Sequence, residues 1–150
     1  MVGVQEQWKR VEIGLGRVEQ VYAGRSGGSD EALYDLYSFF LNCYQLRDWL
    51  RADPKSGMSD DEVDAVIRNC VPLRVCADLA NRTKHVEPLR SPWIDRNAAF
   101  LSQNVTVYVG TGTSAHYWEI SAGGATYDAQ DVARDCVSEW RRVLTQRGLL

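Results

Sequence analysis

The chain has 150 residues, of which 45% are hydrophobic, 25% charged and 10% aromatic, and its 17 basic and 20 acidic side chains give a formal net charge of −3. This composition is typical of a globular domain, and it excludes a disordered chain, a collagen-like repeat and a coiled-coil rod. The length predicts a single domain over residues 1–150. The slightly acidic balance provides no overall attraction to nucleic acid.

The sequence shows no pattern of export or membrane insertion. Charged residues are scattered among the apolar positions of residues 1–20, unlike the apolar core of a signal peptide. The most apolar stretch, Leu36–Leu46, has eleven residues, whereas a bilayer span needs about 20. We therefore expect a cytoplasmic protein that does not cross a membrane.

Two long helices are predicted in the first third of the chain. Apolar residues recur at steps of three and four over residues 4–23, and the glycine- and serine-rich residues 24–29 end this helix. A second helix is expected from the N-cap Asp30 to residue 52, where Asp53 and Pro54 stop it. This second helix is apolar almost all round, which places it at the centre of a bundle.

Two shorter helices and a change of periodicity follow. The capping-box pattern Ser59–Glu62 begins a third helix, and Pro72 begins a fourth that runs to His85. Residues 105–120 then alternate apolar and polar side chains in two runs around a glycine-rich turn, which predicts a β-hairpin. A last helix is expected over residues 128–147. The predicted fold is mainly α: a bundle of four to five helices with one β-hairpin inserted before the C-terminal helix.

Four cysteines are present, and no two of them form a C-x-x-C pair. They are Cys43, Cys70, Cys76 and Cys136, and each falls on a predicted helix or at its edge. In a reducing compartment such residues act as small core hydrophobes, so we expect all four to be buried free thiols. Because the ligand spacing of a zinc site is missing, the sequence predicts no metal site.

Two of the predicted helices carry polar residues at positions that require an explanation. Arg47 and Asp48 lie on arcs of the second helix that otherwise look buried, so they require partners unless the end of that helix protrudes into solvent. The fourth helix carries a dense polar group near its C-terminal end, consisting of Asp78, Asn81, Arg82, Lys84 and His85. If the two helices pack together, we expect Arg47 or Asp48 to bind Asn81, Lys84 or His85. The alternative is a solvated face with charge ladders along the helix.

A family resemblance rests on these same two helices. The segments Tyr37–Trp49 and Cys76–His85, with the ending Asn-x-x-Lys-His, resemble an uncharacterised group of small bacterial and phage helical proteins that are similar to HEPN-like domains. The resemblance implies an up-and-down helical bundle, and many members are ribonucleases, toxins or antiphage effectors. It implies His85 as an acid/base, with Arg82 and Asn81 beside it. Active members place an Arg several residues before that His, whereas two residues separate Arg82 from His85 here.

Three functions are compatible with the sequence. The first is a non-catalytic interaction module that binds a partner protein or a second copy of itself, and for this Trp93 and Trp118, outside the helices, are candidate contact residues. The second is a metal-independent endoribonuclease or toxin of HEPN type, in which case RNA is the partner. The third is small-molecule or nucleotide binding in a pocket between helices. No cofactor is predicted.

Overall fold

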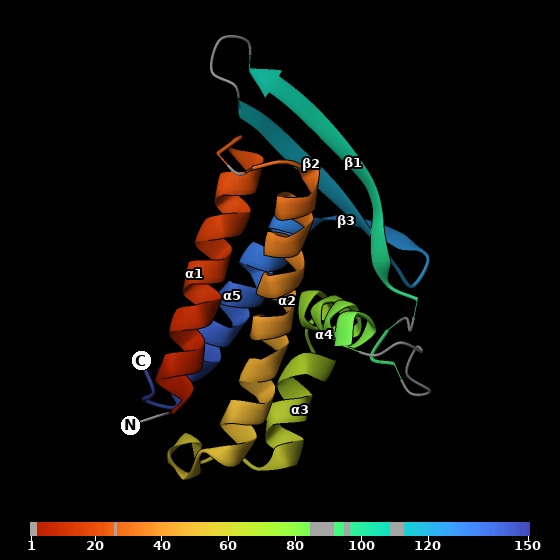
Figure 1. Cartoon of the computed structure of the whole chain (residues 1–150). Helices are drawn as coiled ribbons and strands as arrows, with labels where there is room; N and C mark the ends of the chain where they lie inside the picture. The colour runs from red at the N-terminus through yellow and green to blue at the C-terminus, as the bar shows by residue number, and fades with distance from the viewer. Residues whose placement is uncertain (1–2, 26, 85–91, 95–96, 109–112) are drawn as a thin grey trace.

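The computed structural model describes residues 3–25, 27–84, 92–94, 97–108 and 113–150, with side chains for all of these except residues 84, 101–108 and 113–116. Three long helices run alongside one another: α1 (Val4–Tyr22), α2 (Ser29–Ala52) and α5 (Ala129–Gln146) (Figure 1). Two shorter helices, α3 (Asp60–Arg68) and α4 (Val71–Lys84), complete the bundle, and α4 crosses the long helices steeply. A short 3-10 turn, Pro54–Ser56, links α2 to α3.

The core is centred on α2, whose buried face contacts the other helices. The largest fully buried side chains of the core belong to α2 and α5, and they include Phe39, Phe40, Leu46 and Trp140. Trp8 and Val11 of α1 close the core from one side. A helix that buries side chains on several faces must be surrounded, and this explains why α2 reads as apolar almost all round its axis.

A three-stranded antiparallel sheet lies across one end of the bundle. Its strands β1 (Ala99–Tyr108), β2 (Thr113–Ala122) and β3 (Ala125–Asp128) follow the order β1-β2-β3. The base of the hairpin is fixed to α2, because the Phe100 ring lies edge-on to Tyr37 at 5.0 Å and to Trp118 at 5.7 Å between ring centroids. The far part of the hairpin extends beyond the ends of α1 and α2 (Figure 1).

The first and last helices close the bundle against each other. Glu19 of α1 binds Arg134 of α5 through two hydrogen bonds of 2.7 and 2.8 Å. Further along, the Arg141 guanidinium lies 5.5 Å from the ring centroid of Trp8. The two ends of the chain therefore lie close together (Figure 1).

The predicted fold class is confirmed, and the differences from the prediction are local. The second helix begins at Ser29 with Gly28 as its N-cap, so Asp30 lies within the first turn, where its charge suits the helix dipole, and does not cap the helix. The capping box of Ser59 and Glu62 is present. The hairpin strands are longer than expected, and β3 was not predicted. Among the described residues, no helix is both long and apolar enough to cross a bilayer.

Candidate functional site

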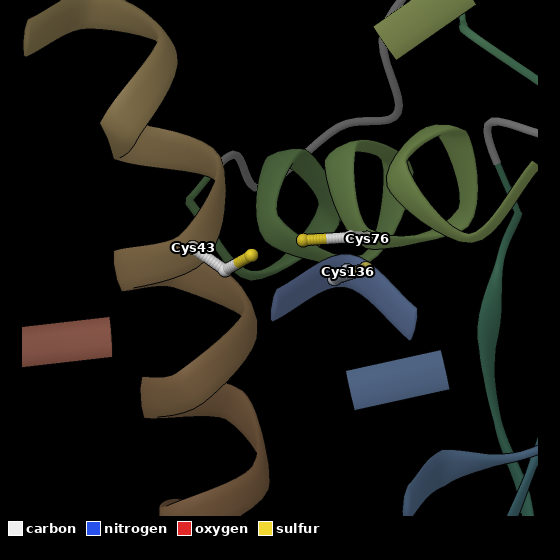
Figure 2. A group of neighbouring side chains, drawn as sticks. All are labelled: Cys43, Cys76 and Cys136. Atoms are coloured by element: carbon white, nitrogen blue, oxygen red, sulfur yellow. The ribbon is translucent and has the colours of Figure 1, made fainter. Parts of the chain in front are cut away.

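Three of the four cysteines meet in the core. Cys43 of α2, Cys76 of α4 and Cys136 of α5 are fully buried, and their three Sγ atoms all lie within 4.8 Å of one another (Figure 2). Cys70 lies between α3 and α4, outside this group, and is half-buried. The expectation of buried free thiols is therefore confirmed for three cysteines and wrong for Cys70. We call Cys43, Cys76 and Cys136 the thiol cluster.

The three thiols of the cluster are electrostatically unequal. Hydrogen bonds from Cys136 and Cys76, with a contribution from Trp140, lower the pKa of the Cys43 thiol against the opposing effect of burial. Burial raises the pKa values of Cys76 and Cys136 well above the usual range. The Cys76 Sγ atom also lies 3.4 Å from the Phe40 carbonyl oxygen, which competes with Cys43 for the single thiol hydrogen. Cys43 is therefore the sulfur that the surroundings favour as a thiolate.

The absence of C-x-x-C spacing does not bear on this arrangement. Such spacing identifies ligands that one loop or turn presents together, whereas the members of the thiol cluster come from three separate helices. The only signal in the sequence was that each cysteine lies on the apolar side of its helix. That pattern predicts burial, but it does not predict that the three sulfurs meet.

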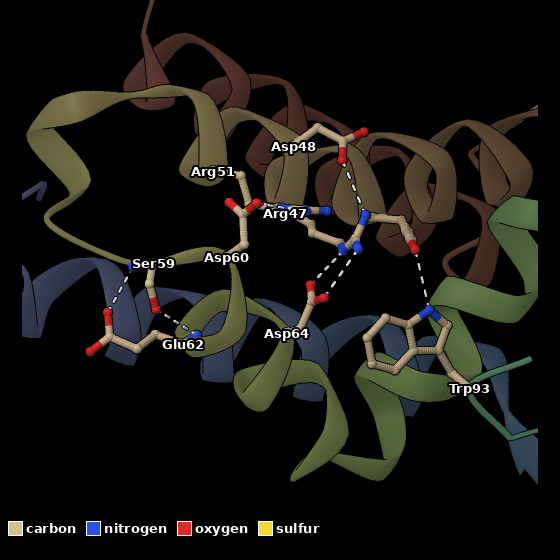
Figure 3. Close-up of polar contacts among 9 residues, drawn as sticks. Arg47, Asp48, Arg51, Ser59, Asp60, Glu62, Asp64 and Trp93 are labelled. Atoms are coloured by element: carbon tan, nitrogen blue, oxygen red, sulfur yellow. Dashed lines mark hydrogen bonds and ion pairs between the residues drawn. The ribbon is translucent and has the colours of Figure 1, made fainter.

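Arg47 binds a partner that the sequence did not suggest. Its guanidinium donates to Asp64 of α3 at 2.7 and 3.3 Å and lies 3.3 Å from the carboxylate of Asp48 (Figure 3). Burial has the largest single effect on the pKa of Arg47 and lowers it, but the hydrogen bond to Asp64, together with the charge interactions with Tyr44 and Asp64, raises the pKa overall. The guanidinium also lies 5.8 Å from the ring centroids of both Tyr44 and Trp93. Arg47 thus forms an ion pair with the third helix, whereas its expected bonds to Lys84 or His85 involve side chains outside the described residues and stay predictions.

Asp48 is not the buried charge that the helical wheel indicated. Its side chain is 62% exposed, because this part of α2 faces outward beside α3. Neighbouring Arg51 binds the equally exposed Asp60 at 2.8 Å (Figure 3). These exposed pairs contribute little to stability.

Arg47, Asp48 and Asn81 nevertheless line one small pocket between α2 and α4, with a volume of about 100 Å³. Tyr44 forms part of its wall. Arg82, on the next position of α4, is exposed. His85 and the side chain of Lys84 lie outside the described residues, so their predicted places in the polar group stay predictions.

Among the described residues, Asp78 is the buried acidic side chain. It is 2% exposed, and its carboxylate accepts the backbone N–H groups of Trp93 at 2.8 Å and Ile94 at 2.6 Å. Asp78 therefore anchors residues 93–94, which precede β1, and it does not belong to a solvated polar face. Trp93 is half-buried, and its indole donates to the Tyr44 hydroxyl at 3.2 Å. Its expected role as an exposed contact residue is accordingly not supported.

Tyr22 joins three elements through one hydroxyl. The hydroxyl group donates to Asp128 at 2.8 Å and lies 3.1 Å from the Trp118 carbonyl, while the backbone N–H groups of Trp118 and Gln130 donate to its oxygen at 3.2 Å. The residue ends α1, and its partners lie on β2 and at the start of α5. Trp118 packs partly buried against the core, so it too is not the exposed binding residue that we expected.

Comparisons with protein-family models, curated proteins and solved structures found no match to this chain. Three features of the described residues bear on function: the thiol cluster, the pocket beside Asn81, and the projecting hairpin.

Proposed function

We propose that this protein is a non-catalytic interaction module that pairs with a second copy of itself through the edge of β1. The observation that carries the proposal is a run of 22 residues, Asn97–Trp118, with no Asp, Glu, Lys or Arg. In a chain that is 25% charged, about five charged residues would be expected there. This run includes all of β1 and most of β2.

The position of β1 in the sheet makes this composition informative. β1 has ten residues and lies at the edge of the sheet, with β2 on one side and no strand on the other among the described residues. Edge strands in monomeric proteins are usually protected by charges, by proline or by being short. β1 has no charge and no proline, and its one irregularity is a register shift between Phe100 and Ser102 near the base. The remaining residues, 102–108, pair continuously with β2.

The distribution of charge favours a second copy of the chain as the partner that binds the edge of β1. A molecule with a net charge of −3 repels its own copy, but the far part of the hairpin, where β1 and β2 carry no charge, projects away from the charged helices (Figure 1). Antiparallel pairing of β1 with β1 of another copy gives a two-fold symmetric interface in which each residue near the axis faces itself. An uncharged strand can do this without placing like charges opposite each other.

We expect the wild-type protein to be a dimer in analytical ultracentrifugation. Val105 lies at the middle of residues 102–108, so Val105→Lys places two positive charges near the axis. The dissociation constant should then rise at least ~10-fold, because like charges at an interface cost several kcal/mol and about 1.4 kcal/mol corresponds to tenfold. Val105→Glu should have the same effect, and an equimolar mixture of the two variants should restore the dimer.

Tyr34→Lys is the matched control, because Tyr34 of α2 is 68% exposed and lies outside the hairpin. It should leave the dimer intact. A monomeric wild-type protein would overturn the proposal, as would a dimer that Tyr34→Lys breaks and Val105→Lys does not. A monomer that binds a strand from a different protein would retain the edge but exclude the second copy.

A second candidate function, a metal-independent endoribonuclease of HEPN type, is supported by the pocket that Arg47, Asp48 and Asn81 share. Under this alternative, His85 exchanges the proton at the scissile phosphate and Arg82 or Lys84 stabilises its charge. Single-stranded RNA should be cleaved in the presence of a metal chelator. His85→Ala should reduce the rate at least ~100-fold, with an unchanged melting temperature. The other histidine provides the control, since His116→Ala should keep full activity; equal rates in both variants would exclude the assignment.

A further inference from the structure

We propose that Cys43, Cys76 and Cys136 form a binding site for a soft trivalent ion of the arsenic and antimony class, held by three sulfur ligands inside the bundle. The site is independent of the proposed interaction through β1, from which it differs in both place and chemistry. It rests on the geometry of the three sulfurs, on a neighbouring indole group and on the charge that a buried site can hold.

The geometry of the thiol cluster is close to that of a three-coordinate site. Atoms that all lie within 4.8 Å of one another have a common centre no more than about 2.8 Å from each, and bonds between thiolate sulfur and a metal are about 2.3 Å long. Each sulfur therefore needs to move inward by less than about 1 Å, which a change in side-chain torsion provides. The three helices already present the ligands from three directions (Figure 2).

The indole of Trp140 is a second, independent observation. Trp140 is fully buried, and its Nε1–H has no hydrogen-bond acceptor of ordinary geometry among the described residues. Among its neighbours is the Cys43 thiol, whose pKa it helps to lower. A thiolate is a much better acceptor than a thiol, so metal ligation of Cys43 would satisfy this buried donor. Core hydrophobes alone would leave the donor without a strong partner.

The charge of the filled site selects the ion. Three thiolates carry three negative charges, and a fully buried site must be close to neutral. Zinc would leave one negative charge and also prefers a fourth ligand, which the three-residue group does not supply. A monovalent copper ion would leave two negative charges. A trivalent arsenic or antimony ion leaves none.

Binding requires no oxidant or reductant. In water, trivalent arsenic is the neutral hydroxide As(OH)₃. Each thiol displaces one hydroxide from arsenic. One As–O bond and one S–H bond break, one As–S bond and the O–H bond of a water molecule form, and three thiols therefore release three waters. Arsenic stays trivalent and no net proton is exchanged. Because the cluster is buried, we expect binding to be slow and limited by opening of the bundle.

The test uses the full chain, sodium arsenite and a reductant that contains no thiol. Native mass spectrometry should show one arsenic atom per chain, and X-ray absorption at the arsenic edge should show three sulfur neighbours and no oxygen. Arsenite should raise the melting temperature of the wild-type protein. Zinc should bind more weakly than arsenite.

Cys70 provides the matched control, because it is the one cysteine outside the cluster. Cys70→Ala should bind arsenite as the wild type does, whereas Cys43→Ala should bind at least ~10-fold more weakly. Equal binding by Cys43→Ala, dependence on Cys70, or loss of the helical circular dichroism on adding arsenite would overturn the proposal. The absorption measurement needs no variant, so it decides the question even if Cys43→Ala fails to fold: oxygen neighbours around arsenic would exclude the three-sulfur site.

Discussion

Replacing Asp78 with Ala should lower the free energy of unfolding by about 2–4 kcal/mol. The change leaves the backbone N–H groups of Trp93 and Ile94 without the carboxylate that now accepts them at 2.8 and 2.6 Å. It also frees the segment that carries Trp93 against Tyr44 and Arg47. The measurement is urea denaturation followed by circular dichroism, with the midpoint and slope both recorded.

Two further variants define the cause. Asp78→Asn keeps one acceptor oxygen, so it should lower the free energy of unfolding by less than Asp78→Ala does. Asp48→Ala removes a carboxylate that is 62% exposed, so it should change stability by no more than about 0.5 kcal/mol. If Asp48→Ala lowered the free energy of unfolding as much as Asp78→Ala, the conclusion that Asp78 of α4 is the buried acidic side chain would be incorrect.

Replacing Tyr22 with Phe should lower the free energy of unfolding by about 2–3 kcal/mol. The hydroxyl contacts four groups, which belong to Trp118, Asp128 and Gln130. Its removal leaves the backbone N–H groups of Trp118 and Gln130 without this acceptor. The phenyl ring itself can still pack against Tyr117, whose centroid lies 5.4 Å away. Thermal unfolding should report the loss. Tyr34→Phe, at a tyrosine that is 68% exposed, should have no measurable effect.

The same substitution should change the response to alkaline pH. Burial is the main cause that raises the pKa of Tyr22 above its ordinary value of 10.0, and Asp128 raises it further. A group whose pKa is raised on folding stabilises the protein fully below the unfolded pKa and loses that contribution as pH rises above it. Wild-type stability should therefore fall above pH about 10 more steeply than that of Tyr22→Phe. Parallel pH profiles for the two proteins would contradict this account of the hydroxyl.

The helices could be predicted from the sequence because their signals are local. The capping box at Ser59 and the stop at Asp53 and Pro54 depend on residues within a few positions of one another. β3 was missed because Gly123 and Gly124 read equally well as the end of the sheet or as a turn to another strand. Four residues, Ala125–Asp128, are too few to show a period.

The contacts of the candidate sites could not be predicted, because each depends on how helices pack. A helical wheel places Arg47 and Asp48 relative to α2 alone, and it does not show that α3 supplies Asp64 to one of them while the other faces solvent. Asp78 looked like one member of a charge ladder because its partners are backbone N–H groups, which no sequence pattern reveals. The positions of three cysteines were known, but not that three helices bring their sulfurs together.

The packing of α1 against α5 affects the order in which the protein folds during synthesis. A chain made from its N-terminal end has α1 and α2 available early, but the surface that covers Trp8 arrives only with α5. Until then the early helices expose an apolar face. Cys136 is also on this last helix, so the three sulfurs meet only when it has docked. Native thiol accessibility of Cys43 thus distinguishes a nascent, open bundle from a finished one.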